Sequence, residues 1–587
     1  MSNVRSGSAI GLSALLSSTA LAVLTSTPAM AQSGSSGSEI KLEEITVTAQ
    51  RRVESLIDAP LSLEAINSDQ LKDQGIARVE ELQMAVPGLV MQYGQGGTLS
   101  PFLRGVGNAL SGNYAENSVA VYVDDVPRPR LRGATDMPFV ERIEVLKGPQ
   151  GALYGRNATG GAINIITNQP NLEQLTGDAR VSYGTSDLID VAGYINVPLA
   201  PTVAFNVAAS HRERDAMVDN KAINATNPLR LPSRPEGMSS GGYSSNKGSE
   251  LADTDSVDAK IAFEPSDTVR LTLRGDYTKV NDTAASGWTQ RDPATLAGLL
   301  SFLSGQVITA DDLQLGKPQH STYADQLPVH ELEEYGTSLK AEFELDPVTI
   351  TSITAYRDNK ESASIDIDAT AIPIAGFTAD FKSKVFSQEV RAVSKLDGPL
   401  QFIAGATYFK DEVRDKTAGE IGLILAGVPF TRDEILAGAI PRISLPATEG
   451  NIDAKSWSVF GEASYQINDA WQLIGSGRYM EEKRDIWFPA QVNTGGIRVE
   501  GDRKEDQFTP ALTLNYKLPM GGLIYARWAK GYKTGGLNNL LNPFALDVNG
   551  DPVGIDDFKP EKLTSYEVGY KAELLDQRLR FVSAVFH

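Results

Sequence analysis

The sequence predicts a mainly β protein, a transmembrane antiparallel β-barrel that is incomplete in this chain and follows a small N-terminal α+β domain. Three observations predict this fold class. From Thr176 onward, segments of roughly ten residues alternate apolar and polar side chains, which is the two-residue period of a strand. The apolar face of many segments begins and ends in an aromatic residue, as at the two interfaces of a membrane barrel. Short connections alternate with long polar ones, such as residues 212–254 and 280–330, as outer-membrane barrels do.

The alternation is clear in "VRLTLRGDYTKV", residues 269–280. One face carries Val269, Leu271, Leu273 and Tyr277, and the other carries Arg270, Thr272, Arg274 and Asp276. A soluble sandwich would hide its apolar face in a core and would rarely border that face with aromatic residues at both ends. A membrane barrel instead turns its apolar face to lipid and its polar face to the lumen. The pattern therefore favours a barrel over a soluble β protein.

The N-terminus predicts a secretory signal peptide over residues 1–31. A single basic residue, Arg5, precedes an apolar run from Ala9 to Leu24, and Ala29-Met30-Ala31 forms an A-x-A cleavage site. We therefore expect the mature protein to leave the cytoplasm. No later stretch reaches about 18 consecutive apolar residues, so no transmembrane helix is expected.

The composition of the 587 residues excludes several classes of function. A net charge of −20 argues against nucleic acid as a partner, because phosphates require a basic face. The chain has no cysteine and only four histidines, without an H-E-x-x-H motif, so no metal site and no cofactor are predicted. An outer-membrane enzyme is disfavoured because no histidine stands beside a recognisable nucleophile. Three of the histidines are expected in or beside loops and the fourth is terminal: His211, His320, His330 and His587.

A Gly/Ser-rich linker, "QSGSSGSE", follows the signal peptide and precedes a short β-prone run, Ile45-Thr46-Val47-Thr48. This run could add as a strand to the sheet edge of a partner. It could equally be the first strand of the domain that follows.

Residues 53–170 are expected to form a compact α+β domain. Turn signals separate short helical and β-prone segments, with Gly75 after the first helix and Pro87-Gly88 after the second. The expected elements are a helix capped by Ser68 and running to Asp73, a helix over residues 77–85, and a strand over residues 118–127 that turns at Asp124-Asp125.

A glycine-rich stretch, "VERIEVLKGPQGALYGRNATGGAINIIT", spans Val140 to Thr167. It lacks the Lys-Ser/Thr pair of a phosphate-binding loop, and the spacing from Gly151 to Gly155 is too wide for a dinucleotide-binding turn. The pattern instead predicts a tight turn between two paired strands. The glycines of this turn are Gly148, Gly151, Gly155, Gly160 and Gly161.

About fifteen strands are expected between Thr176 and His587, and the last is cut off at "RFVSAVFH". A barrel that ends there would leave an open sheet edge in lipid, where each unsatisfied backbone group costs several kcal/mol. We therefore expect a fragment of a longer protein, although a truncated gene product would have the same sequence.

Several ordered motifs resemble those of the TonB-dependent outer-membrane receptors, in which an N-terminal plug fills a 22-stranded barrel. The motifs of the N-terminal part are Ile45 to Ala49, Pro87-Gly88-Leu89, Arg104-Gly105, Val121 to Asp124 followed by Val126-Pro127, and Val140 to Thr167. In the barrel, "SQEVRAVSK", "YARWAKGYKTGG" and "FKPEKLTSYEVGYK" also look familial.

The resemblance implies a signal peptide over 1–31, a linker with a TonB box over 32–49, a plug over 50–170, and a barrel over 171–587 that lacks its C-terminal strands. The TonB box would be Ile45, Thr46, Val47, Thr48 and Ala49. The glycine-rich turn would let the plug close a wide lumen and still move. Only residues 32–42 separate the signal peptide from the box, which is too short for an additional signalling domain.

The resemblance also implies contacts between plug and barrel. Arg104, Glu141 and Arg142 lie in plug motifs and would meet barrel carboxylates. Glu567 is the expected partner because it has lumen-facing parity in "SYEVGYK", and Glu389 is a second candidate. These charges could instead lie on solvated turns. Candidate ligand contacts are two tyrosines placed where apical plug loops would be, Tyr93 and Tyr114, although exposed tyrosines are common in loops.

The function that the resemblance implies is energised uptake of a scarce ligand across the outer membrane, most commonly a ferric siderophore. Another nutrient, such as a carbohydrate, cobalamin or an aromatic compound, and a non-functional truncated receptor remain alternatives. The expected partners are TonB, with the inner-membrane ExbB–ExbD energising complex, the outer-membrane lipid and the small ligand.

Overall fold

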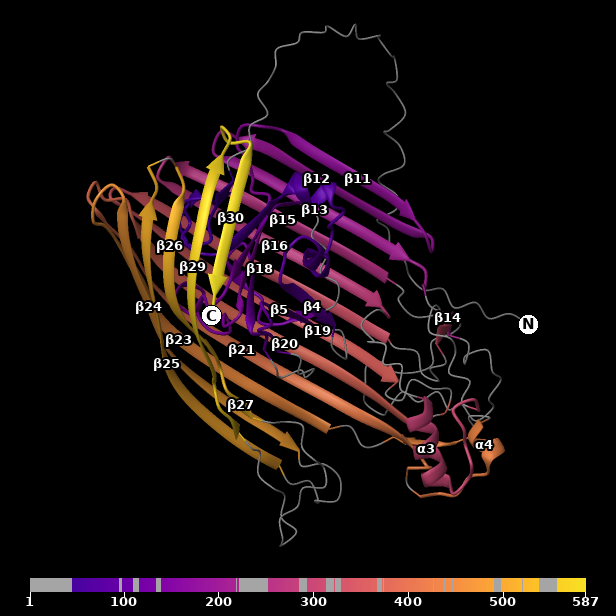
Figure 1. Cartoon of the computed structure of the whole chain (residues 1–587). Coiled ribbons are helices and arrows are strands. Elements are labelled where there is room, and N and C mark those ends of the chain that lie inside the picture. Colours follow the sequence, from indigo (N-terminus) through magenta and orange to yellow (C-terminus); the bar gives the residue numbers. More distant parts are fainter. Residues whose placement is uncertain are drawn as a thin grey trace, which may run out of the picture.

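The computed structural model describes residues 45–93, 98–108, 116–132, 139–217, 219–220, 252–283, 293–312, 321–322, 329–366, 372, 374–425, 427–436, 440–444, 448–489, 498–519, 521–537 and 557–587. The predicted signal peptide and linker therefore lie outside the described residues. A small N-terminal domain lies on the concave side of one large curved sheet (Figure 1).

The large sheet contains a meander of fifteen antiparallel strands that follow one another in sequence order, and one more short strand, β22 (Arg442–Ser444), pairs with β21 beside this path. It begins at Thr176, where the alternating pattern starts, and the expected number of strands is confirmed. The strands are β11 (Thr176–Gly184), β12 (Leu188–Ala200), β13 (Val203–Arg214), β15 (Ala252–Ser266), β16 (Val269–Asp282), β18 (Val329–Leu345), β19 (Val348–Asp366), β20 (Ala375–Ser394), β21 (Leu400–Gly422), β23 (Thr448–Gln466), β24 (Trp471–Pro489), β25 (Arg498–Lys517), β26 (Leu523–Lys533), β29 (Glu561–Leu574) and β30 (Leu579–Phe586).

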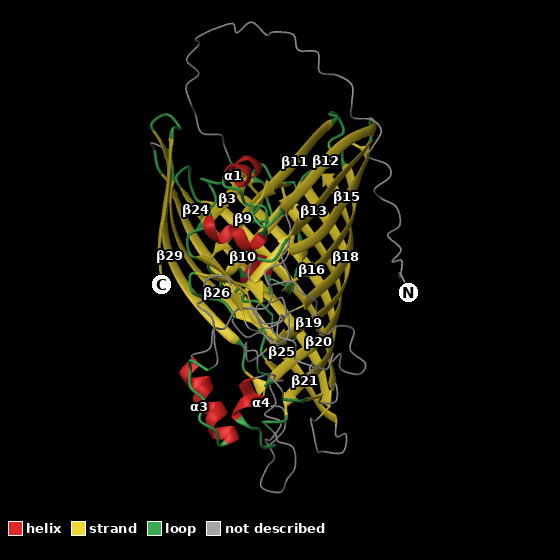
Figure 2. Cartoon of the chain, turned by 90° about the vertical axis from the view of Figure 1, so that its right-hand side faces the viewer, coloured by secondary structure: helices red, strands yellow, loops and turns green. Residues whose placement is uncertain are grey.

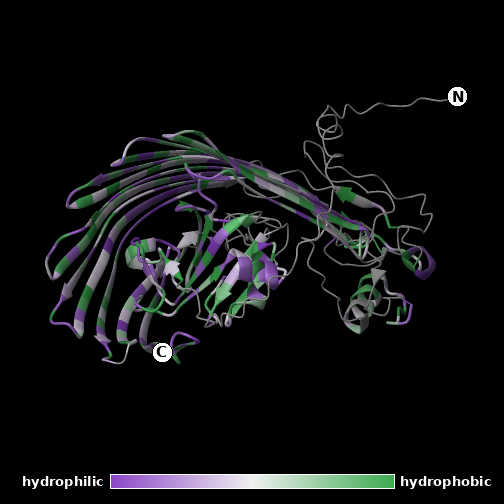
Figure 3. Ribbon diagram, turned by 90° about the horizontal axis from the view of Figure 1, so that it is seen from above, coloured by the Kyte–Doolittle hydropathy of each residue, from purple (hydrophilic) through white to green (hydrophobic). Residues whose placement is uncertain are grey.

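The sheet turns its apolar side chains outward and its polar side chains toward the N-terminal domain. On β16, the outward Leu273 is 49% exposed, whereas the inward Thr272 and Arg274 are 7% and 5% exposed. A soluble protein would show the opposite arrangement. The alternation is visible along the curved sheet in Figure 3, where the N-terminal domain occupies the concave side. The outer surface of the sheet therefore suits lipid rather than water.

Short and long connections are separated between the two ends of the sheet. The β12–β13, β15–β16 and β18–β19 connections are two-residue turns. Long connections lie at the opposite end with two helices, α3 (Pro293–Ser304) and α4 (Arg432–Leu436), as Figure 2 shows. In an outer-membrane barrel the short turns face the periplasm and the long loops face the exterior, which gives the sheet its orientation.

Within the described residues, the outermost strands β11 and β30 do not pair with each other, so the sheet is open along one side. None of the described helices combines the length and the apolar character needed to span a bilayer.

The N-terminal domain contains a five-stranded sheet with strand order β3-β9-β10-β6-β7 and a three-stranded sheet, β4-β5-β8. Its elements are β1 (Thr46–Val47), β2 (Glu54–Ser55), β3 (Leu63–Asn67), α1 (Ser68–Asp73), the 3₁₀ helix η1 (Val79–Met84), β4 (Leu89–Tyr93), β5 (Thr98–Leu103), β6 (Val119–Val123), β7 (Val126–Pro127), β8 (Leu131–Arg132), β9 (Val140–Lys147), α2 (Gly151–Tyr154) and β10 (Gly161–Thr167). Its core includes the fully buried Val79, Ile143 and Ile163.

Three local predictions need correction. The N-cap of α1 is Asn67 rather than Ser68, because Asn67 and Gln70 form a reciprocal capping box. The second helix is a 3₁₀ turn, which ends just before Pro87. The glycine-rich turn contains a four-residue helix, α2, before it reaches β10.

Candidate functional site: the plug–barrel interface and the Ile45–Ala49 segment

The predicted TonB box, Ile45–Ala49, is folded against the N-terminal domain. Strand β1 pairs with β2 in an antiparallel hairpin, with Val47 opposite Glu54. The side chains of Val47 and Ala49 are fully buried. The Thr48 backbone N–H donates a 2.8 Å hydrogen bond to Glu144 Oε1 in β9. The segment is therefore held by both apolar packing and a buried carboxylate.

Arg142 contacts this segment, and its ion pairs with described residues are to Glu144 and Glu141 of the N-terminal domain. Its Nε donates a 2.8 Å hydrogen bond to Glu144 Oε1, and its Nη2 donates to Thr48 Oγ1 at 3.2 Å. It also pairs with Glu141, whose side chain is 45% exposed. The expected contact of Arg142 and Glu141 with the barrel is thus replaced by contacts within the plug. Strand β9 turns Arg142 toward β1. The alternation of side chains along the barrel strands does not predict which way β9 faces.

Glu54, which lies opposite Val47, makes the stability of the β1–β2 hairpin depend on pH. Burial raises the pKa of Glu54 to about 8, with the neighbouring Glu462 adding to the rise and Arg52 and Lys571 opposing it. In the unfolded chain this carboxyl ionises near pH 4.5. The folded hairpin therefore retains a proton that the opened hairpin releases, so its stability falls as pH rises from about 4.5 to about 8.

We expect the protection of the β1 and β2 amides against hydrogen exchange to fall between pH 5 and pH 8. This fall should remain after the pH dependence of the intrinsic exchange rate has been subtracted. Glu54→Gln removes the titrating group and should flatten this dependence. Glu64→Gln, which breaks the Lys147–Glu64 ion pair elsewhere in the plug, is the matched control and should retain the wild-type slope. Hydrogen exchange read by mass spectrometry is the measurement. An unchanged slope in Glu54→Gln would contradict the assignment.

Arg51, two residues after the box, joins the plug to the barrel wall. It pairs with Asp125 of the plug, and its Nη2 lies 3.8 Å from Glu389 Oε2 in β20. Arg391 completes the network, with contacts of 2.9 Å to Asp125 and 2.7 Å to Glu389. Burial alone would lower the pKa of Arg51, but Glu389 and Asp125 outweigh it and raise that pKa. Glu389 is therefore a plug contact, although its plug partner is Arg51 rather than Arg104 or Arg142.

Arg104 reaches Glu567 across the interface. The Nη1 atom of Arg104 lies 2.6 Å from Glu567 Oε2, and the two side chains are 10% and 6% exposed. Glu567 Oε1 also accepts hydrogen bonds from the Ser62 backbone N–H at 3.0 Å and from the Tyr525 hydroxyl at 2.7 Å. The guanidinium of Arg104 lies 3.8 Å from the ring centre of Phe586 in β30. One barrel carboxylate therefore holds two separate parts of the plug.

The glycine-rich turn lies inside the curve of the sheet, against β24, β25 and β26. A Cβ on Gly151 would lie 3.0 Å from the Thr509 side chain, and one on Gly155 would lie 3.2 Å from the Arg478 guanidinium. Arg478 donates to the carbonyl oxygens of Ala152 and Leu153 at 3.2 and 2.8 Å, respectively. Two of the glycines thus allow close approach to the barrel, and Gly155 also adopts a positive φ of 84°.

Gly161→Ala is expected to loosen the plug. A Cβ at this position would lie 2.2 Å from the Leu146 carbonyl oxygen and 2.6 Å from Leu103 Cδ2, at a φ of 150° that side chains rarely adopt. Strands β9 and β10 would have to separate, at a cost of roughly 2 kcal/mol or more. Limited proteolysis of the plug measures the effect. Gly193→Ala in β12, where a Cβ meets nothing within 4 Å, should behave as wild type, and equal resistance of both variants would refute the expectation.

A second charged cluster lies nearer the long-loop end. Glu116 pairs with Arg156 at 3.0 Å and with Arg484 of the barrel at 2.8 Å, and Arg156 also reaches Glu482 at 2.7 Å. Burial alone would raise the pKa of Glu116, but Arg156 and Arg484 outweigh it and lower that pKa to about 2. Glu116 therefore stays ionised at any physiological pH.

Two of the cavities between plug and barrel border residues described above. One of about 90 Å³ is bordered by Tyr122, Arg128, Arg156, Phe409 and Arg478. Another of about 910 Å³ is bordered by Thr48, Arg51 and Arg142 of the plug and by the short-turn ends of β15 to β21. The Ile45–Ala49 segment thus borders a large space at the end of the sheet that faces the periplasm.

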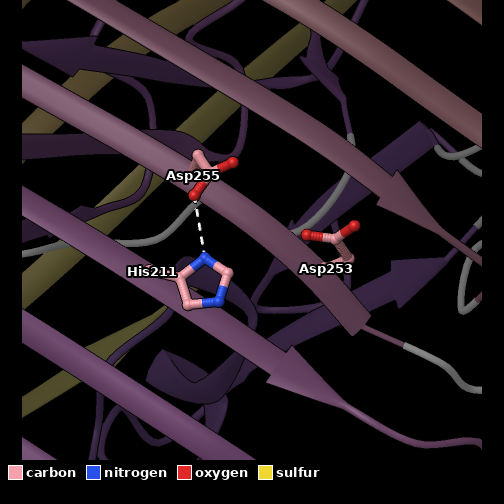
Figure 4. A group of neighbouring side chains, drawn as sticks. All are labelled: His211, Asp253 and Asp255. Atoms are coloured by element: carbon pink, nitrogen blue, oxygen red, sulfur yellow. Dashed lines mark hydrogen bonds and ion pairs between the residues drawn. The ribbon is translucent and has the colours of Figure 1, made fainter. Parts of the chain in front are cut away.

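His211 and His330 lie in strands of the large sheet, and His587 directly follows its last strand. His211 in β13 faces outward, with its Nδ1 2.8 Å from Asp255 Oδ1 in β15 and Asp253 alongside (Figure 4). His330 is buried in β18, where its ring nitrogens lie 3.0 Å from Asp282 and 3.3 Å from Glu361. His320 lies outside the described residues. The His211 pair sits outside the lumen and so has no direct contact with the pathway that the plug closes.

Two predicted ligand contacts cannot be placed, and four contact residues were not predicted. Tyr114 and the side chain of Tyr93 fall outside the described residues. Sequence reasoning missed Arg51, Asp125, Glu144 and Arg478. Arg51 lies two residues after the box and Asp125 lies in the Asp124-Asp125 turn, so closeness to recognised motifs could have pointed to those two.

A plug joined by buried ion pairs to the polar face of a lipid-facing antiparallel sheet defines a gated outer-membrane receptor. Models of the TonB-dependent receptor plug domain and of the TonB-dependent receptor-like β-barrel match residues 55–162 and 209–587. The chain belongs to the TonB-dependent receptor family, and it is an outer-membrane protein.

Curated relatives and solved structures agree with this assignment. The pesticin receptor of Yersinia enterocolitica is 22% identical over 566 residues, covering 95% of this chain and 72% of that protein. The catecholate siderophore receptor Fiu of Escherichia coli K12 is 23% identical over 568 residues, covering 90% and 68%. The ferric yersiniabactin uptake receptor FyuA from Yersinia pestis superposes with a TM-score of 0.69 at 18% identity, covering 90% of this chain and 72% of that chain. The siderophore receptor PiuA from Acinetobacter baumannii gives 0.68 at 18% identity, covering 93% and 74%.

Proposed function

We propose that this receptor imports a ferric siderophore and that TonB, energised by the ExbB–ExbD complex, pulls on Ile45–Ala49 to move the plug. The observation that carries the coupling proposal is the position of this segment. It is a short edge hairpin, held by Glu144 and Arg142, beside a cavity of about 910 Å³ at the short-turn end of the sheet. An extended segment there could add to a partner's sheet once it leaves the plug.

Tight capture of a scarce ligand creates the need for energy. A nanomolar Kd corresponds to about −12 kcal/mol, so the ligand does not leave its site unaided on a useful timescale. Moving one proton charge through 100 mV at the inner membrane releases about 2.3 kcal/mol, so several protons together could supply this work. The ion pairs Arg51–Asp125–Arg391 and Arg104–Glu567 are among the plug–barrel contacts that such a pull has to release.

The ligand class rests on the relatives. The proteins to which this chain is similar include siderophore receptors, although identities near 22% leave a carbohydrate, cobalamin or an aromatic compound as alternatives. Transport rather than catalysis is the activity that we propose.

The test is uptake in an iron-starved strain that lacks its other receptors. Cells expressing the full-length receptor should accumulate radioactive iron from a ferric catecholate or a ferric phenolate siderophore and should stop when the proton gradient is collapsed. Labelled cobalamin and oligosaccharide should not enter. Gradient-dependent entry of one of those nutrients, without entry of iron, would replace the ligand class and keep the transport mechanism.

A further inference from the structure

A histidine and three carboxylates lie together on the outer face of the sheet, near the long-loop end of two paired strands. His211 in β13 is directly opposite Asp255 in β15, and Glu213 in β13 is directly opposite Asp253 in β15. Because side chains alternate between the two faces of a strand, all four share one face. Figure 4 shows His211 and Asp255 on neighbouring strands, with Asp253 alongside. We name these four residues the His211 cluster.

The ligand atoms of this cluster are close enough to share one ion. One nitrogen of His211 and one carboxylate oxygen from each of Asp253 and Asp255 lie within 4.8 Å of one another. His211 Nδ1 is 2.8 Å from Asp255 Oδ1, and His211 Nε2 is 4.0 Å from Glu213 Oε2. Ligand atoms at about 2.0–2.2 Å from a tetrahedral Zn²⁺ ion lie about 3.3–3.6 Å apart. Small side-chain rotations therefore suffice to bring these atoms around one ion.

The His211 cluster has an excess of negative charge. Its three carboxylates face one imidazole, and among the described residues no lysine or arginine forms an ion pair with any of them. Lys279 on β16 is directly opposite Asp255, but Glu333 on β18 is directly opposite Lys279 on its other side. Glu213 and Asp253 are like charges directly opposite each other, an arrangement that destabilises a sheet. A bound cation would relieve this repulsion.

The position of the cluster lets an ion reach it from water. Asp255 lies two residues closer to the long-loop end than Val257, which is directly opposite Tyr277. Tyr277 is directly opposite Tyr335, and outward aromatic side chains mark the interface between membrane and water. The side chains of His211 and Asp255 are 46% and 55% exposed, so ions have access to both.

We propose that His211, Asp253 and Asp255 bind a divalent first-row transition-metal ion of the Zn²⁺ class. Glu213 or water would complete the coordination. An imidazole nitrogen combined with carboxylate oxygens suits Zn²⁺, whereas Ca²⁺ and Mg²⁺ prefer oxygen ligands alone. The ion would join β13 to β15 at the points where the connection of residues 215–251 leaves the sheet and returns to it. Because its ligands come from two strands separated by that connection, the site has no compact sequence motif.

The test is calorimetric titration with Zn²⁺ of the full-length receptor, prepared without a histidine tag in an uncharged detergent. His211→Asn should weaken the tightest Zn²⁺ site at least about tenfold, since loss of residues that merely orient metal ligands already costs about 10–100-fold. His587→Asn removes an exposed histidine that directly follows β30 and is the matched control, so its Zn²⁺ affinity should equal that of wild type.

A second pair of variants tests the carboxylates. Asp253→Asn with Asp255→Asn should weaken Zn²⁺ binding at least as much as His211→Asn does. Asp453→Asn with Asp485→Asn removes two outward carboxylates that lie directly opposite each other on β23 and β24 without a histidine beside them. This control changes the charge of the outer face by the same amount and should bind Zn²⁺ as wild type does. Equal affinities of the two double variants would overturn the proposal.

Further arms separate coordination by the imidazole from general attraction to acidic side chains. With one equivalent of Cu²⁺, electron paramagnetic resonance should show nitrogen coupling in wild type that is lost in His211→Asn. Mg²⁺ at the same concentration should not displace Zn²⁺, because Mg²⁺ takes oxygen ligands and retains several of its waters. Equal Zn²⁺ affinity of wild type and His211→Asn, or displacement of Zn²⁺ by Mg²⁺, would also contradict the assignment.

Discussion

Replacing Val47 with proline is expected to stop import and to leave capture of the ligand at the cell surface intact. Proline removes the backbone N–H of residue 47 and fixes its φ, so the segment can no longer complete a strand in a partner's sheet. We expect the ligand to be captured at the long-loop end, which faces the exterior and lies far along the sheet from β1, so capture should not change. Uptake should fall to background, roughly a hundredfold below wild type, because strand addition depends on main-chain hydrogen bonds.

The control must separate the loss of the donor from the loss of packing, because Val47 is fully buried. Val47→Ala removes the same buried methyl groups and keeps the N–H, so import should continue. Binding to whole cells at 0 °C and uptake of the same labelled ligand at growth temperature are the two measurements. Normal uptake by Val47→Pro would show that Ile45–Ala49 is not the segment on which TonB pulls.

The barrel was predictable because the pattern that predicts it is local. Alternation along each segment fixes which side chains share a face, so the strand count and the lumen-facing parity of Glu567 could be inferred without tertiary information. Glu567 does face the plug, where it meets Arg104. The start of the sheet at Thr176 follows from the same alternation.

The plug contacts were less predictable because they depend on how the plug is oriented inside the barrel. Glu141, Arg142 and Glu389 all carry charges in recognisable motifs, yet Arg142 binds Glu144 and Glu389 binds Arg51. The sequence shows which side chains of a barrel strand face the lumen. It does not show which barrel strand each plug residue meets. The hairpin that buries Val47 also could not be foreseen, because both an ordinary first strand and a partner-binding strand have the same β-prone sequence.

Glu567→Ala is expected to unseat the plug, because it leaves three partners without an acceptor. Arg104 would keep a buried charge with no counter-ion, which typically costs 3–5 kcal/mol. The Ser62 N–H and the Tyr525 hydroxyl would lose hydrogen bonds of 3.0 and 2.7 Å. We expect faster hydrogen exchange in β3 and β9 and greater sensitivity of cells to large antibiotics that the outer membrane normally excludes.

Two matched variants separate the buried pair from general loss of charge. Arg104→Met with Glu567→Gln removes both charges and keeps an acceptor for Ser62 and Tyr525, so the plug should stay closer to wild type than in Glu567→Ala, as replacement of a whole buried ion pair often allows. Glu344→Ala breaks an exposed pair with Lys395 and should have little effect on either measurement. If Glu567→Ala exchanged as slowly and excluded antibiotics as well as Glu344→Ala, the Arg104–Glu567 contact would not hold the plug, and other plug–barrel ion pairs, such as the Arg51–Asp125–Arg391 network and the Glu116–Arg484 pair, would have to hold it.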